Sequence, residues 1–138
     1  MKDLNKIFIQ NLKNISNQAG DITKILSVKD ENYKGFGEIY TSCINKGSIK
    51  AWKYHKKMTL NLRVLLGEVK FVFYDGNQSF KEYIFSANDF TLITVPPKIW
   101  YGFKSSNCED SLILNLTDLL FNEKEILRKQ IHEIGYDW

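Results

Sequence analysis

The chain has 138 residues and a formal net charge of +3, from 19 Lys and Arg against 16 Asp and Glu. With 43% hydrophobic and 25% charged residues, it has the composition of one globular domain, which excludes intrinsic disorder. No apolar run approaches the ~20 residues of a membrane helix, and the charged N-terminus is unlike a cleavable signal peptide. We therefore expect a cytoplasmic protein with no membrane partner. The charge is too small to indicate nucleic acid binding.

Short segments with a period of two follow one another along most of the chain, which indicates β-strands. In chain order the expected strands cover residues 22–28, 36–43, 49–55, 60–66, 69–74, 80–85, 91–95, 100–103 and 111–116. Strands that recur every 8–12 residues with turn residues between them favour an all-β sandwich or barrel.

Turn residues separate several of these strands. Gly67-Glu68 between two apolar runs predicts a tight hairpin, and Asp75-Gly76-Asn77 predicts a second turn. Pro96-Pro97 ends a strand, because neither residue can donate a backbone hydrogen bond.

One short helix is expected near the C-terminus. Asn122 suits the N-cap position, and Glu125 stands three residues later, as in a capping box. Ile126, Leu127 and Ile131 would form its apolar side.

The segment 49–55 holds the candidate chemistry. On a strand, Lys53 and His55 share one face, whereas Trp52 lies on the other. His55 can act as a base near neutral pH, while Lys53 would first need a much lower pKa. Alternation sends Lys50 to the other face unless a bulge intervenes. Cys43 and Cys108 show no base partner and are expected to be reduced packing residues.

Three segments together resemble the sugar-nucleotide branch of the cupins, which contains dTDP-4-dehydrorhamnose 3,5-epimerases and dTDP-sugar 3,4-ketoisomerases. Residues 49–57 resemble the stretch Arg-Gly-Trp/Leu-His-Tyr-His-Lys-Lys, residues 62–69 resemble LVRVLRGEV, and residues 95–103 resemble IPPGxxHGF. The ending IGYDW is also similar. The resemblance implies a cupin jelly-roll β-barrel or sandwich over residues 19–138, with the short C-terminal helix. It implies a homodimer in which residues 1–18 form an arm that could be a strand exchanged between subunits.

The resemblance also implies a function. The implied function is that of a cofactor-independent epimerase or ketoisomerase in surface polysaccharide (O-antigen or capsule) synthesis. The implied substrate is a nucleotide-linked 4-keto-6-deoxysugar, most simply a dTDP-sugar. Such chemistry needs a base, an acid and stabilisation of an oxyanion. The catalytic candidates are His55, Lys53 and Tyr101, and the candidates for substrate binding are Lys50, Arg63, Asn61, Tyr40 and Lys57.

The roles of some candidates remain open. Lys53 stands where relatives have the catalytic His, and it suits a cation for phosphate or for an oxyanion better than a base. Tyr101 could be an acid, a stacking surface or a packing residue. Arg63 could pair with a carboxylate or with a ligand phosphate.

Two further expectations follow from the same residues. Metal-binding cupins use a His-x-His pair, a Glu and a later His, whereas His55 stands alone here, so we expect neither metal nor cofactor. The Lys at position 53 also supports an alternative: a catalytically inactive cupin that binds a sugar nucleotide or a partner enzyme.

Overall fold

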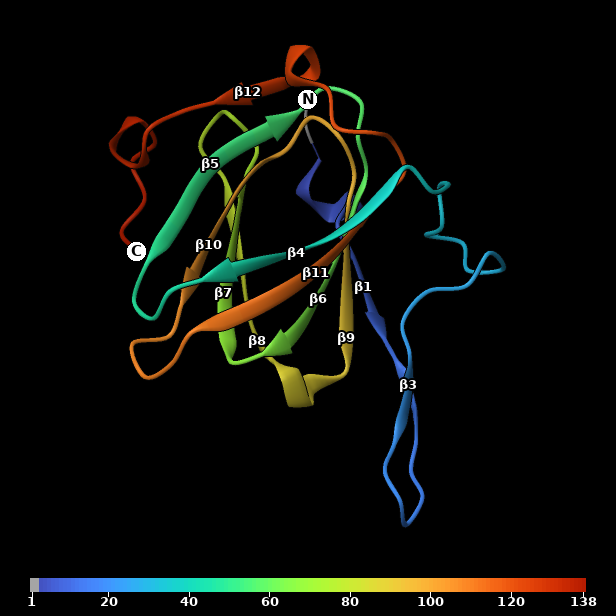
Figure 1. Ribbon diagram of the computed structural model, residues 1–138. Coiled ribbons are helices and arrows are strands. Elements are labelled where there is room, and N and C mark those ends of the chain that lie inside the picture. Colours follow the sequence, from blue (N-terminus) through green and yellow to red (C-terminus); the bar gives the residue numbers. More distant parts are fainter. Residues whose placement is uncertain (1–2) are drawn as a thin grey trace.

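The computed structural model describes residues 3–138, which form two five-stranded antiparallel sheets packed as a sandwich (Figure 1). The first sheet has the order β1 (Phe8–Asn11), β9 (Thr91–Val95), β6 (Leu60–Leu66), β11 (Ser111–Thr117) and β4 (Glu38–Ile44). The second has the order β12 (Ile126–Arg128), β5 (Ile49–His55), β10 (Trp100–Ser105), β7 (Glu68–Tyr74) and β8 (Phe80–Ser86). The all-β prediction is confirmed, and the two sheets do not close into a barrel.

The main core lies between the two sheets, as the alternation of the strands requires. Along β11 every second residue is buried, from Ser111 through Ile113 and Asn115 to Thr117. Large side chains such as Phe71 and Phe73 from β7 face the same core and are almost fully buried. Each such side chain stabilises the fold by roughly 1.5–3 kcal/mol.

A second apolar cluster covers the outer side of the second sheet. Trp52, Trp100 and Val72 are buried there, and Tyr136 and Trp138 of the C-terminal segment pack against them. Gly102 makes this packing possible: a Cβ there would lie 2.8 Å from Cη2 of Trp138 and 2.7 Å from Cβ of Ala51. The C-terminal segment is thus fixed over the back of β5 and β10.

The hairpin predicted at Gly67-Glu68 is wrong. β6 pairs with β9 and β11 in one sheet, whereas β7 pairs with β8 and β10 in the other. Gly67, at φ 74°, is instead the corner where the chain crosses between sheets. A glycine with positive φ is compatible both with a hairpin turn and with a corner between two sheets, so the local sequence does not distinguish the two structures.

The turn at residues 75–77 is confirmed, because β7 and β8 do pair across it. Oδ1 of Asp75 accepts hydrogen bonds from the backbone N–H groups of Asn77, Gln78 and Ser79.

The predicted C-terminal helix is also wrong. Asn122 caps as expected, but only one 3₁₀ turn follows, η3 (Glu123–Glu125), and residues 126–128 form β12 on the edge of β5. The carboxylate of Glu125 does not complete a capping box, because it binds His55 and the backbone N–H of Lys57. The remaining helical turns are all 3₁₀: η1 (Leu4–Lys6), η2 (Ala87–Asp89) and η4 (Ile131–Glu133).

The N-terminal residues form two different structures. β1 pairs with β9 of its own chain, while β2 (Lys13–Ile15) and β3 (Ile22–Lys24) make a separate hairpin. This hairpin projects away from the two sheets (Figure 1). Exchange of a strand between subunits stays a prediction. Over residues 3–138, no helix has the length and apolar character needed to cross a membrane.

Candidate active site

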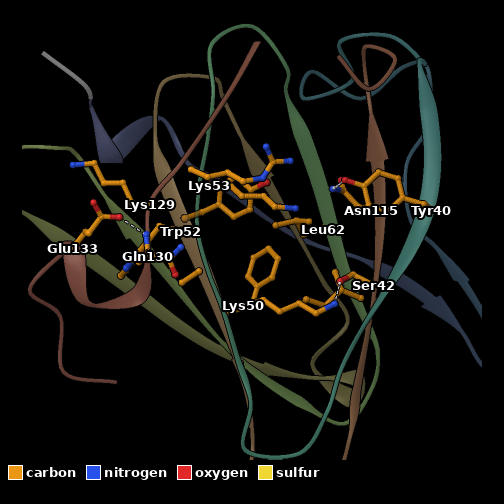
Figure 2. A pocket seen from close by; sticks show the side chains of 15 residues that line it. Tyr40, Ser42, Lys50, Trp52, Lys53, Leu62, Asn115, Lys129, Gln130 and Glu133 are labelled. Carbon is orange, nitrogen blue, oxygen red and sulfur yellow. Dashed lines mark hydrogen bonds between the residues drawn. The ribbon is translucent and has the colours of Figure 1, made fainter. Parts of the chain in front are cut away.

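A cavity of about 500 Å³ opens between the two sheets (Figure 2). β5 and β10 form one wall, β4, β11 and β6 form the other, and residues 128–133 lie at its rim. Its lining residues are Tyr40, Ser42, Lys50, Ala51, Trp52, Lys53, Leu62, Tyr101, Phe103, Ile113, Asn115, Arg128, Lys129, Gln130 and Glu133.

A bulge in β5 brings two lysines to the cavity. Opposite β10 the register passes from Lys53↔Tyr101 to Ala51↔Gly102, so Trp52 is an extra residue without a partner across the strands. Lys50 and Lys53 therefore both line the cavity, although strict alternation would separate them. Nζ of Lys50 reaches across to donate to Oγ of Ser42 on β4, at 3.1 Å (Figure 2).

The cavity carries an excess of positive charge. Lys50, Lys53, Arg128 and Lys129 line it, and Glu133 is the one carboxylate among its described lining residues. Burial lowers the pKa of Lys53, and the neighbouring cations Arg128 and Lys50 lower it further. Such a site favours anionic ligands and negative charge that develops during a reaction.

Three side chains form a hydrogen-bonded chain that ends at the cavity wall. Nδ1 of the buried His55 lies 2.5 Å from Oε1 of Glu125, and its Nε2 lies 2.9 Å from the hydroxyl of Tyr101. Oε2 of Glu125 accepts from the backbone N–H groups of Lys57 and Met58, at 3.0 and 3.3 Å. Tyr101 lines the cavity, whereas His55 lies behind it.

The charges of this chain are set by its surroundings. Burial tends to raise the pKa of Glu125, but the hydrogen bonds from His55 and the two backbone N–H groups outweigh burial and hold it below the usual value. Burial above all, then the nearby Tyr40 and Glu125, raises the pKa of Tyr101. Glu125 is therefore ionised and accepts the Nδ1–H of His55. In the neutral imidazole with its hydrogen on Nδ1, Nε2 accepts from the Tyr101 hydroxyl.

On the opposite wall a tyrosine and an asparagine form a pair. Nδ2 of Asn115 donates to the hydroxyl of Tyr40 at 2.9 Å. Figure 2 shows both side chains across the cavity from Lys53. Burial raises the pKa of Tyr40, so it keeps its proton at neutral pH.

The fold and this cavity can be compared with solved structures. The structure superposes on a dTDP-sugar isomerase from Desulfovibrio desulfuricans G20 with a TM-score of 0.89 and 27% identity, over 96% of this chain and 90% of that one. It also superposes on the dTDP-4-dehydrorhamnose 3,5-epimerase of Bacillus anthracis, with TDP and PPi bound (TM-score 0.85, 16% identity, 96% and 85% covered). The chain has the RmlC-like cupin fold.

The structure also superposes on a sugar 3,4-ketoisomerase from Thermoanaerobacterium thermosaccharolyticum in complex with TDP, with a TM-score of 0.79 and 19% identity, over 92% of this chain and 90% of that one. No protein-family model and no curated protein matches the sequence.

The structure brings five of the eight predicted site residues together: Tyr101, Lys53, Lys50 and Tyr40 on the cavity, and His55 directly behind it. The other three, Asn61, Arg63 and Lys57, lie elsewhere. Leu62 of β6 points into the cavity, so its neighbours Asn61 and Arg63 point to the outer face of the first sheet.

The three residues outside the cavity have other contacts. Asn61 accepts from Thr94 and donates to the backbone oxygen of Leu116, and Nη2 of Arg63 donates to the backbone oxygen of Ala87. The side chain of Lys57 lies beyond the end of β5 in a separate surface hollow.

Sequence reasoning missed several residues of the site, among them Asn115 and Arg128 on the cavity and Glu125 behind it. The local sequence assigns Glu125 to a helix cap, because Asn122 three residues earlier fits that motif. Asn115 could have been found, since it is a polar residue at a position of β11 whose neighbours two residues away, Ile113 and Thr117, are buried. Across the described residues, no group of three or more His, Cys, Asp or Glu could hold a metal ion.

Proposed function

We propose that this cupin is an isomerase of nucleotide-linked 4-keto-6-deoxysugars, acting as a 3,5-epimerase or a 3,4-ketoisomerase without a cofactor. The observation that carries this proposal is the chain Glu125–His55–Tyr101, which joins a buried carboxylate to a cavity lined by cations. Proton transfer at the carbon next to a ketone needs a base, which the hydrogen-bonded chain supplies, and a positive site for the enolate oxygen, which the cations supply. The structural similarity to a dTDP-sugar isomerase supports the same class of reaction.

The substrate we propose is a dTDP-sugar. Lys50 and Arg128 can bind the diphosphate, because both are cations that line the cavity beside Lys53. The ammonium of Lys129 instead lies 5.4 Å from the centre of the Trp100 ring, on the outer side of the second sheet. Two of the similar structures hold TDP, which is consistent with this assignment.

We also propose a homodimer in the cytoplasm that serves surface polysaccharide synthesis. Exposed apolar side chains on the projecting hairpin, Ile15 and Ile22, and Ile39 on the outer face of the first sheet support a second subunit there.

In the proposed mechanism, Tyr101 contacts the substrate and His55 acts through it. The Tyr101 oxygen takes the proton from the carbon beside the ketone, while the phenolic proton moves to Nε2 of His55. The resulting imidazolium is stabilised by the Glu125 carboxylate at 2.5 Å. The electron pair of the broken C–H bond moves to the ketone oxygen, and Lys53 stabilises the oxyanion. In an epimerisation, a solvent-derived proton is then delivered to the same carbon from the opposite face, the ketone re-forms, and His55 releases its proton to solvent. In a ketoisomerisation, the proton of the neighbouring hydroxyl passes to the former ketone oxygen, and His55 returns its proton through Tyr101 to the former ketone carbon.

A second assignment of the base has its own support. The pKa of Lys53 is lowered by burial and by Arg128 and Lys50, which increases the fraction of neutral amine. Lys53 would then take the carbon-bound proton, and the Tyr101–His55 pair would donate to the ketone oxygen.

Hydrogen exchange in deuterated water tests the function and separates the two assignments. The protein is incubated with dTDP-4-keto-6-deoxyglucose, and deuterium at the carbons beside the ketone is followed by NMR. We expect exchange in the wild type, and a loss of about 10²–10⁴-fold in Tyr101→Phe and His55→Asn. Retained exchange in His55→Asn with loss in Lys53→Met makes Lys53 the base. Tyr83→Phe, a tyrosine of β8 outside the cavity, is the matched control.

The same experiment addresses the inactive alternative. No exchange at high protein concentration with several keto sugars refutes the isomerase. Thermal stabilisation by dTDP without exchange would identify a binding protein instead. Absence of both effects would exclude any role with these nucleotide sugars.

A further inference from the structure

One side chain that lines the cavity has a buried polar atom without a hydrogen-bond partner. Among the described residues that line the cavity, this holds for Asn115 alone. The residue is 5% exposed, and its Oδ1 has no donor, while its Nδ2 is used by the Tyr40 hydroxyl. A buried polar atom without a partner destabilises the folded protein, and a bound ligand that supplies a hydrogen-bond donor removes this cost. The wall formed by β4 and β11 therefore has an unfilled position for a hydrogen-bond donor.

The hydroxyl of Tyr40 adds a hydrogen-bond donor next to this acceptor. Because its oxygen accepts from Asn115, its own hydrogen remains available to a ligand in the cavity that Tyr40 lines. The pair thus offers one donor and one acceptor side by side. The same holds if the Asn115 amide is turned round. The Tyr40 hydroxyl would then donate to Oδ1, Nδ2 would donate to the ligand, and the Tyr40 oxygen would accept from the ligand.

One donor and one acceptor match a hydroxyl group, which both donates and accepts. A ketone oxygen only accepts, so it would leave the acceptor of the pair empty. The imide edge of a thymine base also offers both functions. The position of Tyr40 favours the sugar, because Tyr40 and Asn115 lie across the cavity from Lys53, which is paired with Tyr101 in the register of β5 and β10 (Figure 2). The pair therefore faces the proton-transfer end of the cavity.

We infer that Tyr40 and Asn115 form a specificity site for a free hydroxyl of the sugar, on the wall opposite Tyr101. This inference rests on the proposed function and adds a requirement to it. The substrate must keep a secondary hydroxyl on the side turned away from Tyr101, while its ketone meets Tyr101 and Lys53. Sugars that lack this hydroxyl should be discriminated against in binding.

Calorimetric titration tests the inference with ligands that carry no ketone and cannot react. The ligands are dTDP, dTDP-6-deoxyglucose and the analogues of the latter that lack one hydroxyl at C2, C3 or C4. We expect Tyr40→Phe and Asn115→Leu each to bind dTDP-6-deoxyglucose about 3–10-fold more weakly, with unchanged affinity for dTDP. One deoxy analogue should bind wild type, Tyr40→Phe and Asn115→Leu equally, because the hydroxyl that the pair recognises is absent.

Each other outcome is decisive. If both variants bind dTDP-6-deoxyglucose as the wild type does, the inference is wrong and the proposed function stands. If both lose affinity for dTDP itself, the pair binds the nucleotide, which also overturns the inference. If the wild type binds none of these ligands, the proposed function and the inference fail together. Tyr83→Phe is the matched control, and Tyr40→Phe suffices if Asn115→Leu does not fold.

Discussion

Replacing Glu125 with glutamine removes the buried negative charge of the site while keeping the size of the side chain. The carboxylate accepts three hydrogen bonds, from Nδ1 of His55 at 2.5 Å and from the N–H groups of Lys57 and Met58 at 3.0 and 3.3 Å. A bond to a charged acceptor contributes about 1 kcal/mol more than a bond to a neutral one. We expect a destabilisation of about 2–3 kcal/mol, or about 7–10 °C in Tm for a domain of this size.

The pH dependence of this difference gives a sharper test. The pKa of Glu125 is lower in the folded protein than the ordinary value of 4.5. The ionised carboxylate therefore stabilises the fold fully above pH 4.5, and this contribution is lost as the pH falls through the lower, folded-state pKa. The difference in unfolding free energy between wild type and Glu125→Gln should be full at pH 7 and shrink below about pH 4.

Urea denaturation at pH 7, 5, 4 and 3 measures this difference. The matched control is Glu123→Gln, two residues earlier, where an exposed carboxylate pairs with Arg128. This variant should lose less than about 1 kcal/mol. A difference for Glu125→Gln that is constant from pH 7 to pH 3, or no larger than that of the control, would refute an ionised carboxylate as the anchor of His55.

Three further predictions concern the same site and its support. Exchange into the keto sugar should fall about 10²–10⁴-fold in Glu125→Gln, because the glutamine amide no longer fixes the Nδ1–H tautomer of His55; deuterium NMR measures this. Gly102→Ala should cost about 1–3 kcal/mol in urea denaturation, since the new Cβ collides with Trp138 and Ala51. Leu62→Ala, at 1% exposure in the cavity wall, should cost about 2–5 kcal/mol in the same assay, and a cost under 1 kcal/mol would contradict its place in the core.

Most strands of this protein could be predicted from the sequence because their alternation is local, although β1, β2 and β12 were not expected. The expected strands at residues 49–55, 60–66 and 91–95 match β5, β6 and β9 residue for residue. The same alternation placed Lys53 and His55 on one face. It also places Asn61 and Arg63 on the face of β6 opposite to Leu62. Only the fold shows that the face with Leu62 lines the cavity.

What the tertiary structure decided depends on contacts between distant segments. Gly67 permits a hairpin or a corner, and only the pairing of β6 with β11 settles that it is a corner. The bulge at Trp52 arises between β5 and β10, so the sequence of β5 alone does not place Lys50 beside Lys53.

Glu125 is the clearest example of this limit. Its local sequence fits a helix cap, yet its carboxylate binds His55, 70 residues earlier in the chain. A buried carboxylate is stabilised most by charge-assisted hydrogen bonds, and the partners for these bonds become available only when β12 adds to the edge of β5. The sequence by itself determined most of the strands and identified Lys53, His55 and Tyr101 as reactive side chains, and the packing of the two sheets decided which side chains share a hydrogen-bonded site.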